Sequence, residues 1–213
     1  MGDQQNYFSH ARPELVAALP AGDGNRVLDL GCGSGAMSQG IREQGKAAEI
    51  WGVEINPDAA AAAKQSGALA RVLEGDLEAV MGELPEGHFT HVIAGDVLEH
   101  LVNPWQALAD LKTCMAPGGQ FICSIPNIRN LSFILALLFK KRFEYRDSGV
   151  MDRTHLRFFA RKDVHDLFAG AGFTDIHIGP IRPKKKLSWR LGKALLGDLV
   201  IKGFLVTARL PEG

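Results

Sequence analysis

The sequence predicts a single α/β domain with a doubly wound, largely parallel sheet that helices cover on both faces. Four short runs rich in β-branched and aromatic residues begin at positions 26, 49, 91 and 120, and helical segments separate them. The chain has 213 residues, of which 46% are hydrophobic, enough for one buried core and too few for two full domains. We therefore expect one domain that spans residues 1–213.

In the first half of the chain, each expected strand leads through a short loop into a helix. Proline suits the first position of a helix, so Pro57 and Pro104 mark two helix starts, and glycines or Pro117 mark the ends. The expected strands are 26–30, 49–53, 70–75, 91–95 and 120–125, and the expected helices begin after Gly35 and cover 57–67 and 104–116.

The alternation becomes irregular after Pro126. A basic and aromatic stretch follows a short apolar helix and precedes further regular elements. The expected elements are an apolar helix at 131–139, a helix at 161–172, a strand at 173–179, a lysine cluster at 182–186, a short helix at 188–197 and a last strand at 203–210.

Composition excludes several classes of partner. The 24 Lys and Arg residues balance 24 Asp and Glu residues, so no overall charge attracts nucleic acid or an anionic surface. The three cysteines form no CxxC pair, which predicts reduced thiols and no metal site. The first residues do not resemble a secretory signal, and the longest apolar run is about half of the roughly 20 residues that span a membrane. We expect a cytoplasmic protein.

Residues 27–36, "VLDLGCGSGA", place three glycines directly after the first strand. Gly31, Gly33 and Gly35 leave backbone amides open to a ligand at the start of a helix. Their spacing also fits the dinucleotide pattern GxGxxA, which keeps an NAD-dependent oxidoreductase open. Glu54, at the end of the second strand, can accept both hydroxyls of a ribose in either case.

Asp29 separates these two interpretations. A carboxylate two positions before the first glycine would repel a pyrophosphate and suits a cationic ligand. The stretch resembles the first motif of the class I S-adenosylmethionine-dependent methyltransferases. The segments "GVEINP", "EGDLE", "DVLEHLVNP" and "MAPGGQFICSIPN" resemble later motifs of that family in the same order, so the resemblance is strong over 26–127 and loose elsewhere.

The resemblance implies a Rossmann-like sheet of seven strands, mostly parallel, with the last strand antiparallel and a small lid insert after the fifth strand. It also implies S-adenosyl-L-methionine as the cofactor, with Glu54 on the ribose, Asp76 on the adenine amino group and Leu77 on the ring. An N-cap on the following helix is the alternative role for Asp76. The implied donor-binding residues are Asp29, Gly31, Gly33, Gly35, Glu54, Ile55, Asp76, Leu77 and Asp96.

The methyl group of such a donor is already activated, so a base helps only where the acceptor is protonated. The segment "DVLEH" places Asp96, Glu99 and His100 at the carboxyl end of the fourth strand, where open α/β sheets bind ligands. His100 is the candidate general base, and ordering of the loop before Pro104 is its alternative role. Enzymes of this family that methylate amino groups of nucleic-acid bases carry an N/D-PP-aromatic sequence here, so "DVLE" disfavours them and a hydroxyl acceptor is expected.

The segment "YRDSGVMDRTHLRFF" gathers polar and aromatic residues after the fifth strand. Similar segments in bacterial members of the family cover the acceptor pocket, which implies Arg153 and His155 as substrate contacts. An internal network of ion pairs is the alternative. We expect a donor-binding core at 26–127, and an acceptor lid with its following helix at 128–172.

The acceptor implied by the resemblance is a small molecule or a lipid- or sugar-linked compound, and no nucleic acid or metal is expected. The apolar helix at 131–139 precedes Lys140, Lys141 and Arg142, which would suit a peripheral membrane contact. A lid on the core or a dimer contact is favoured over it, so we expect a monomer or a homodimer. A non-catalytic donor-binding or assembly protein is a further alternative.

Overall fold

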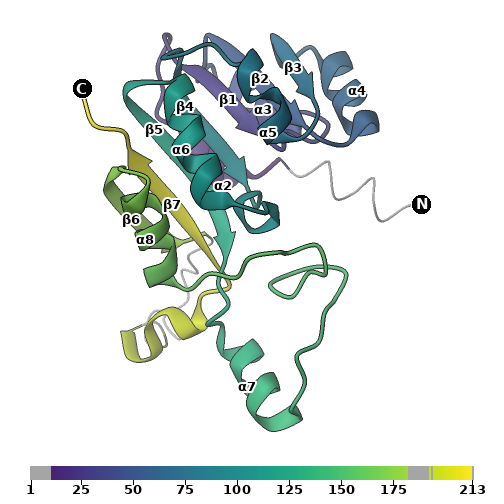
Figure 1. Ribbon diagram of the computed structural model, residues 1–213, viewed down its shortest axis with the longest axis vertical. Helices are drawn as coiled ribbons and strands as arrows, with labels where there is room; N and C mark the ends of the chain where they lie inside the picture. The colour runs from purple at the N-terminus through teal and green to yellow at the C-terminus, as the bar shows by residue number, and fades with distance from the viewer. Residues whose placement is uncertain (1–10, 182–191, 193, 213) are drawn as a thin grey trace.

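A seven-stranded sheet organises the computed structural model, which describes residues 11–181, 192 and 194–212 (Figure 1). The strand order is β3-β2-β1-β4-β5-β7-β6. The strands are β1 (Arg26–Leu30), β2 (Glu49–Glu54), β3 (Arg71–Glu74), β4 (Phe89–Gly95), β5 (Met115–Pro126), β6 (Thr174–Pro180) and β7 (Gly203–Arg209).

The direction of the strands confirms the expected mostly parallel sheet. β1 pairs in parallel with β2 and β4, and β3 and β5 extend the sheet in the same direction. β7 pairs antiparallel with both β5 and β6 and is therefore the reversed strand. The order of connection reverses between β1 and β4, so the carboxyl ends of these strands form the crevice where such sheets bind ligands.

Seven α-helices and three short 3-10 helices lie wholly within the described part of the chain. They are α2 (Pro13–Ala18), α3 (Ala36–Glu43), α4 (Pro57–Ser66), α5 (Leu77–Val80), α6 (Pro104–Cys114), α7 (Leu131–Lys140), α8 (Arg161–Gly170), η1 (Met81–Glu83), η2 (Leu98–His100) and η3 (Gly197–Val200). The lysine cluster at 182–186 and half of the helix expected at 188–197 lie outside the described residues, and residues 192 and 194–196 of that helix are helical.

Two helix boundaries match their sequence signals, and a third does not. α4 and α6 start at proline, and the side chains of Asn56 and Asn103 cap them by accepting backbone N–H groups at 3.0 and 3.2 Å. α6 ends at Cys114, earlier than expected, because Met115 already pairs with Phe89 of β4. α2, which has six residues, was not among the expected helices.

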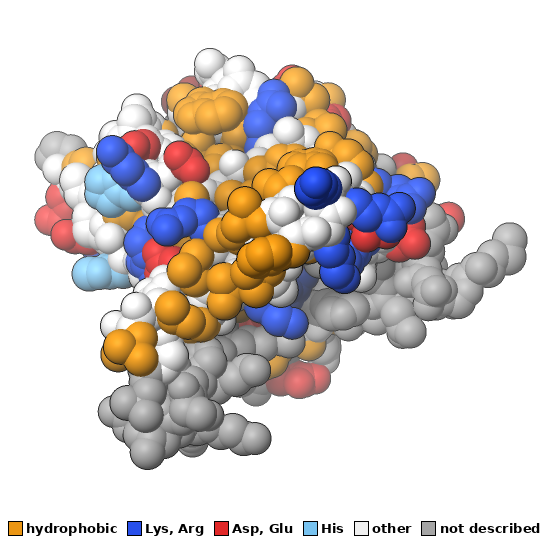
Figure 2. Space-filling model, turned by 90° about the horizontal axis from the view of Figure 1, so that it is seen from below, with side chains coloured by type: hydrophobic (Ala, Val, Ile, Leu, Met, Phe, Trp, Pro, Cys, Tyr) orange, Lys and Arg blue, Asp and Glu red, His pale blue; other side chains and the backbone are white. Residues whose placement is uncertain are grey.

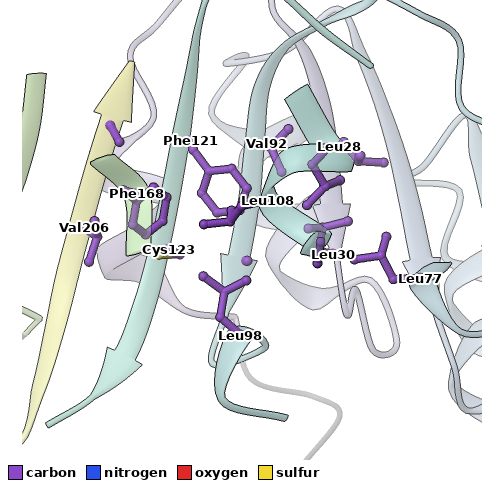
Figure 3. Packing of buried hydrophobic residues seen from close by; sticks show 14 of the residues in the cluster. Leu28, Leu30, Leu77, Val92, Leu98, Leu108, Phe121, Cys123, Phe168 and Val206 are labelled. Carbon is purple, nitrogen blue, oxygen red and sulfur yellow. The ribbon is translucent and has the colours of Figure 1, made fainter. Parts of the chain in front are cut away.

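Alternation along β1 separates two hydrophobic clusters, one on each face of the sheet. Leu28 and Leu30 pack on the side of α5, α6 and α8, where Phe121 and Phe168 are fully buried (Figure 3). Val27 faces the opposite cluster, to which α2 and α3 contribute. Asp29 therefore points to the α3 face, beneath the turn that joins β1 to α3.

The insert between β5 and α8 has two parts of different character. None of the residues of α7 is buried, and Figure 1 shows this helix well away from the sheet. Met151, Asp152, His155 and Phe159 are buried, so the second part packs against the domain. In the described part of the chain, no helix combines the length and apolar character needed to cross a bilayer.

Candidate active site

The turn after β1 depends on its three glycines. Gly31, Gly33 and Gly35 have φ values of 63°, 56° and 85°, a region that strains residues with a side chain. A Cβ atom on Gly31 would also lie 2.9 Å from Cγ2 of Val97. Because Gly31 N–H donates to the Val53 carbonyl at 2.8 Å, the turn is fastened to the end of β2.

Glu54 holds the same turn with its carboxylate. Its Oε2 accepts the N–H of Gly33 at 2.8 Å and its Oε1 accepts the N–H of Asn56 at 2.8 Å, and the residue is buried. A carboxylate oxygen has a second lone pair, so Glu54 can brace the loop and still accept from a ribose hydroxyl. The predicted ribose contact is thus compatible with this geometry.

Asp29 is fully buried under the glycine turn. Its Oδ2 accepts the Ser38 hydroxyl at 2.6 Å, while its Oδ1 has no hydrogen-bond partner among the described residues. Burial raises the pKa of Asp29 to about 7, the Ser38 hydrogen bond lowers it, and the nearby Glu54 carboxylate raises it. The backbone amides of the turn are not open as expected, because the N–H groups of Gly31, Gly33 and Gly35 donate to Val53, Glu54 and Cys32. The unmatched carboxylate oxygen beneath the turn fits the amino-acid end of S-adenosylmethionine, which carries an ammonium.

We expect the affinity for S-adenosylhomocysteine to depend on the ionisation of Asp29. The cationic ammonium requires the ionised carboxylate, so affinity should fall by up to roughly tenfold per pH unit below about pH 7. Asp29→Asn should weaken binding above this pH and remove most of the dependence. Calorimetric titrations at several pH values measure both effects. An affinity of the native chain that does not change with pH would contradict this role.

The expected adenine contacts are arranged at the ends of β2 and β3. Ile55 is 66% exposed, so its side chain is available to a ring. Asp76 caps α5 by accepting the N–H of Glu78 at 2.9 Å, as its alternative role required, and Leu77 is buried. The adenine contacts of these residues stay predictions.

Asp96, at the end of β4, is fixed on both carboxylate oxygens. Its backbone has φ 54°, its Oδ1 accepts the Ser124 hydroxyl at 2.6 Å, and its Oδ2 forms an ion pair with Arg12 at 2.6 Å. Neither partner was among the predicted site residues. Ser124 could have been found from register, because it lies beside Gly95 on the neighbouring strand. Arg12 directly precedes α2, which gave no clear signal.

His100 and His155 come together although they are far apart in the chain. Their ring centroids are 4.7 Å apart, and their Nδ1 atoms lie 3.2 and 3.1 Å from the carbonyl oxygens of Thr154 and Val150. Because a carbonyl only accepts, each Nδ1 carries the proton and each Nε2 carries the lone pair. The two imidazoles are therefore oriented to accept a proton at Nε2.

Glu99 completes this group and was not among the predicted site residues. Its side chain is buried and both carboxylate oxygens lack hydrogen-bond partners in the described structure. Burial raises the pKa of Glu99 well above its ordinary value, and the Asp96 carboxylate raises it further. One ligand atom from each of Glu99, His100 and His155 lies within 4.8 Å of the others, a spacing that could also hold a metal ion.

The two predicted substrate contacts are placed differently. His155 is buried against His100. Arg153 has a side chain that is 63% exposed and forms an ion pair with Asp147 at 2.9 Å. The main chain of Glu99 accepts the N–H groups of Leu156 and Arg157, which ties the insert to the end of β4.

A mostly parallel sheet with a reversed β7, a glycine turn fastened to an acidic β2 end, and an unmatched carboxylate beneath that turn define a class I S-adenosylmethionine-dependent methyltransferase. Residues 3–178 match the family model described as "Methyltransferase domain". The chain belongs to this methyltransferase family.

Similar proteins include the ubiquinone biosynthesis O-methyltransferase of Cereibacter sphaeroides, which is 30% identical over 170 residues. That alignment covers 76% of this chain and 65% of the relative. The enzyme of the same name from Azotobacter vinelandii is 32% identical over 117 residues, or 54% of this chain and 50% of the relative. This chain thus spans between half and two thirds of the length of these relatives.

Solved structures support the fold. A SAM-dependent methyltransferase from Archaeoglobus fulgidus superposes with a TM-score of 0.67 at 20% identity, covering 97% of both chains. Phosphoethanolamine N-methyltransferase 2 of Haemonchus contortus, in complex with S-adenosyl-L-methionine, gives a TM-score of 0.65 at 15% identity. The second match covers 94% of this chain and 52% of the other.

Proposed function

We propose that this protein transfers a methyl group from S-adenosylmethionine to a hydroxyl of a small-molecule or lipid- or sugar-linked acceptor. The observation that carries this proposal is the orientation of His100, whose Nδ1 is held by the Thr154 carbonyl. With the proton on Nδ1, Nε2 carries the lone pair of the ring, and His100 lies at the carboxyl edge of the sheet, the same edge as the glycine turn.

In this proposal the chain positions the reactants and accepts one proton. S-adenosylmethionine, when bound, supplies a methyl group that its positive sulfonium already activates. Asp29, the glycine turn and Glu54 would hold the donor, with Ile55, Asp76, Leu77 and Asp96 as further contacts. His100 would take the proton of the acceptor hydroxyl as the oxygen bonds to the methyl carbon, and the electrons of the broken carbon–sulfur bond stay on sulfur.

The ionisation of His100 supports this role. Burial and the neighbouring His155 lower its pKa, while the Thr154 carbonyl raises it. The pKa of His100 is lowered overall, so the imidazole is neutral at neutral pH, and the neutral form can accept a proton. The similar proteins named above as O-methyltransferases agree with a hydroxyl acceptor.

Residues 1–213 would form one domain, with a donor core at 26–127 and an acceptor lid and helix at 128–172, where Arg153 and His155 contact the acceptor. The three cysteines are free and buried, which suits the cytoplasm. The protein would act there as a monomer or a homodimer.

Incubation with methyl-labelled donor and fractionated cell extract tests the proposal. We expect the label to appear in a small or lipid-soluble product as an ether methyl group. Transfer of the label to an amine or to nucleic acid would contradict hydroxyl methylation. Absence of transfer across all fractions, despite measurable donor binding, would favour the non-catalytic alternative.

A further inference from the structure

Helix α7 and the residues that follow it expose large apolar side chains on both sides of a short basic run. Leu138 is 63% exposed, Phe139 is 78% exposed and Phe143 is 50% exposed, and no residue of α7 is buried. Exposure of this extent on neighbouring large side chains is uncommon without a partner. In the described structure, α7 is therefore not packed into the core as a conventional lid.

Basic residues lie beside these apolar side chains. They are Arg129, Lys140, Lys141, Arg142 and Arg146, all exposed. One acidic residue, Glu144, lies among them and pairs with Arg146 at 3.8 Å. Figure 2, which views the molecule from the side of α7, shows apolar side chains bordered by Lys and Arg. We call residues 129–146 the α7 surface.

We propose that the α7 surface binds the interface of an anionic lipid bilayer. Apolar and aromatic side chains beside clustered positive charge suit the headgroup region of such a bilayer. The helix has 10 residues, about 15 Å in length, so it would lie in the interface and not cross it. Docking of a second copy is less suitable, since a symmetric contact would bring two sets of these five basic residues together.

The α7 surface lies at the edge of the sheet where the parallel strands end. α7 follows the carboxyl end of β5, and Asn127, just before it, bridges to Phe159 of the buried part of the insert. The carboxyl ends of the parallel strands carry His100 and the glycine turn on this same edge of the sheet. A bilayer bound at α7 would thus face the ligand-binding edge of the domain.

Sedimentation with vesicles tests this inference without donor or acceptor, so its outcome does not depend on the proposed reaction. The full chain is mixed with vesicles of phosphatidylcholine, or of phosphatidylcholine and phosphatidylglycerol at about 3:1. We expect binding to the anionic vesicles that weakens with added salt. Lys140→Gln with Lys141→Gln should weaken it roughly 25-fold, about fivefold for each charge.

A charge-matched control is Lys64→Gln with Lys162→Gln, two exposed lysines on α4 and α8, which should leave vesicle binding nearly unchanged. Leu138→Ser with Phe139→Ser should lower binding at least about tenfold and preserve the thermal unfolding temperature, because neither residue is buried. The proposal would be overturned if the native chain bound neither kind of vesicle, or if the control variant lost as much vesicle binding as the Lys140 and Lys141 variant. If the native chain formed a dimer in analytical ultracentrifugation, the α7 variants alone were monomeric and no vesicle binding occurred, the α7 surface would instead be a contact with a second copy.

Discussion

Glu54→Ala is expected to lower the affinity for S-adenosylhomocysteine at least about 100-fold. The change removes two charge-assisted hydrogen bonds, to the N–H groups of Gly33 and Asn56, each of which contributes roughly 1.5–3 kcal/mol. It also removes the proposed acceptor for the ribose hydroxyls. Calorimetric titration of the native and variant chains measures the loss.

Two further variants make this result interpretable. Glu74→Ala removes an exposed acid at the end of β3, which pairs only with Lys64 in the described structure, and should leave affinity nearly unchanged. Glu54→Gln keeps the shape but turns an amide nitrogen toward a backbone donor, so an intermediate loss is expected. The donor site described above would be contradicted if the Glu54→Ala chain had the unfolding temperature of the native chain and an affinity for S-adenosylhomocysteine within about threefold of it.

His100→Ala is expected to lower methyl-transfer turnover by roughly 100- to 10,000-fold, with little change in donor affinity. The physical reason is loss of the proton acceptor oriented by the Thr154 carbonyl. In the native chain the neutral imidazole is the active form, so the rate should fall as pH decreases through the pKa of His100. Because that pKa is lowered, the fall should occur below the ordinary value of 6.5.

Rate measurements between about pH 5 and pH 8 test this dependence, with the acceptor found in the labelling experiment. His165→Ala, an exposed histidine on α8, serves as the matched control and should change neither rate nor pH profile. A native rate that is flat across this range, or a His100→Ala rate equal to that of the control, would remove His100 from the mechanism.

The donor half of the fold could be predicted because its signals are local. Apolar runs of strand length, Pro57 and Pro104 at helix starts, and glycines after β1 each act within a few residues. The parallel order then follows from helical crossovers between consecutive strands. The end of α6 was misjudged by two residues because pairing of Met115 with β4 overrides the local helical preference.

The acceptor side was less predictable because its contacts are long-range. The carboxyl end of β4 and the insert each showed polar residues, but nothing in the sequence indicated that His155 would contact His100 and that Arg153 would remain at the surface. The burial of Glu99 was equally hidden, since an acidic residue in a loop normally faces water. These features depend on how the insert folds back on the sheet.

Calorimetry on the full chain with S-adenosylhomocysteine and with NADH tests the central claim most directly. The site described above predicts saturable binding of S-adenosylhomocysteine and no measurable binding of NADH. The reason is that the carboxylate of Asp29, buried beneath the glycine turn, would repel the negatively charged pyrophosphate of NADH. Tight binding of NADH with no response to S-adenosylhomocysteine would contradict the account.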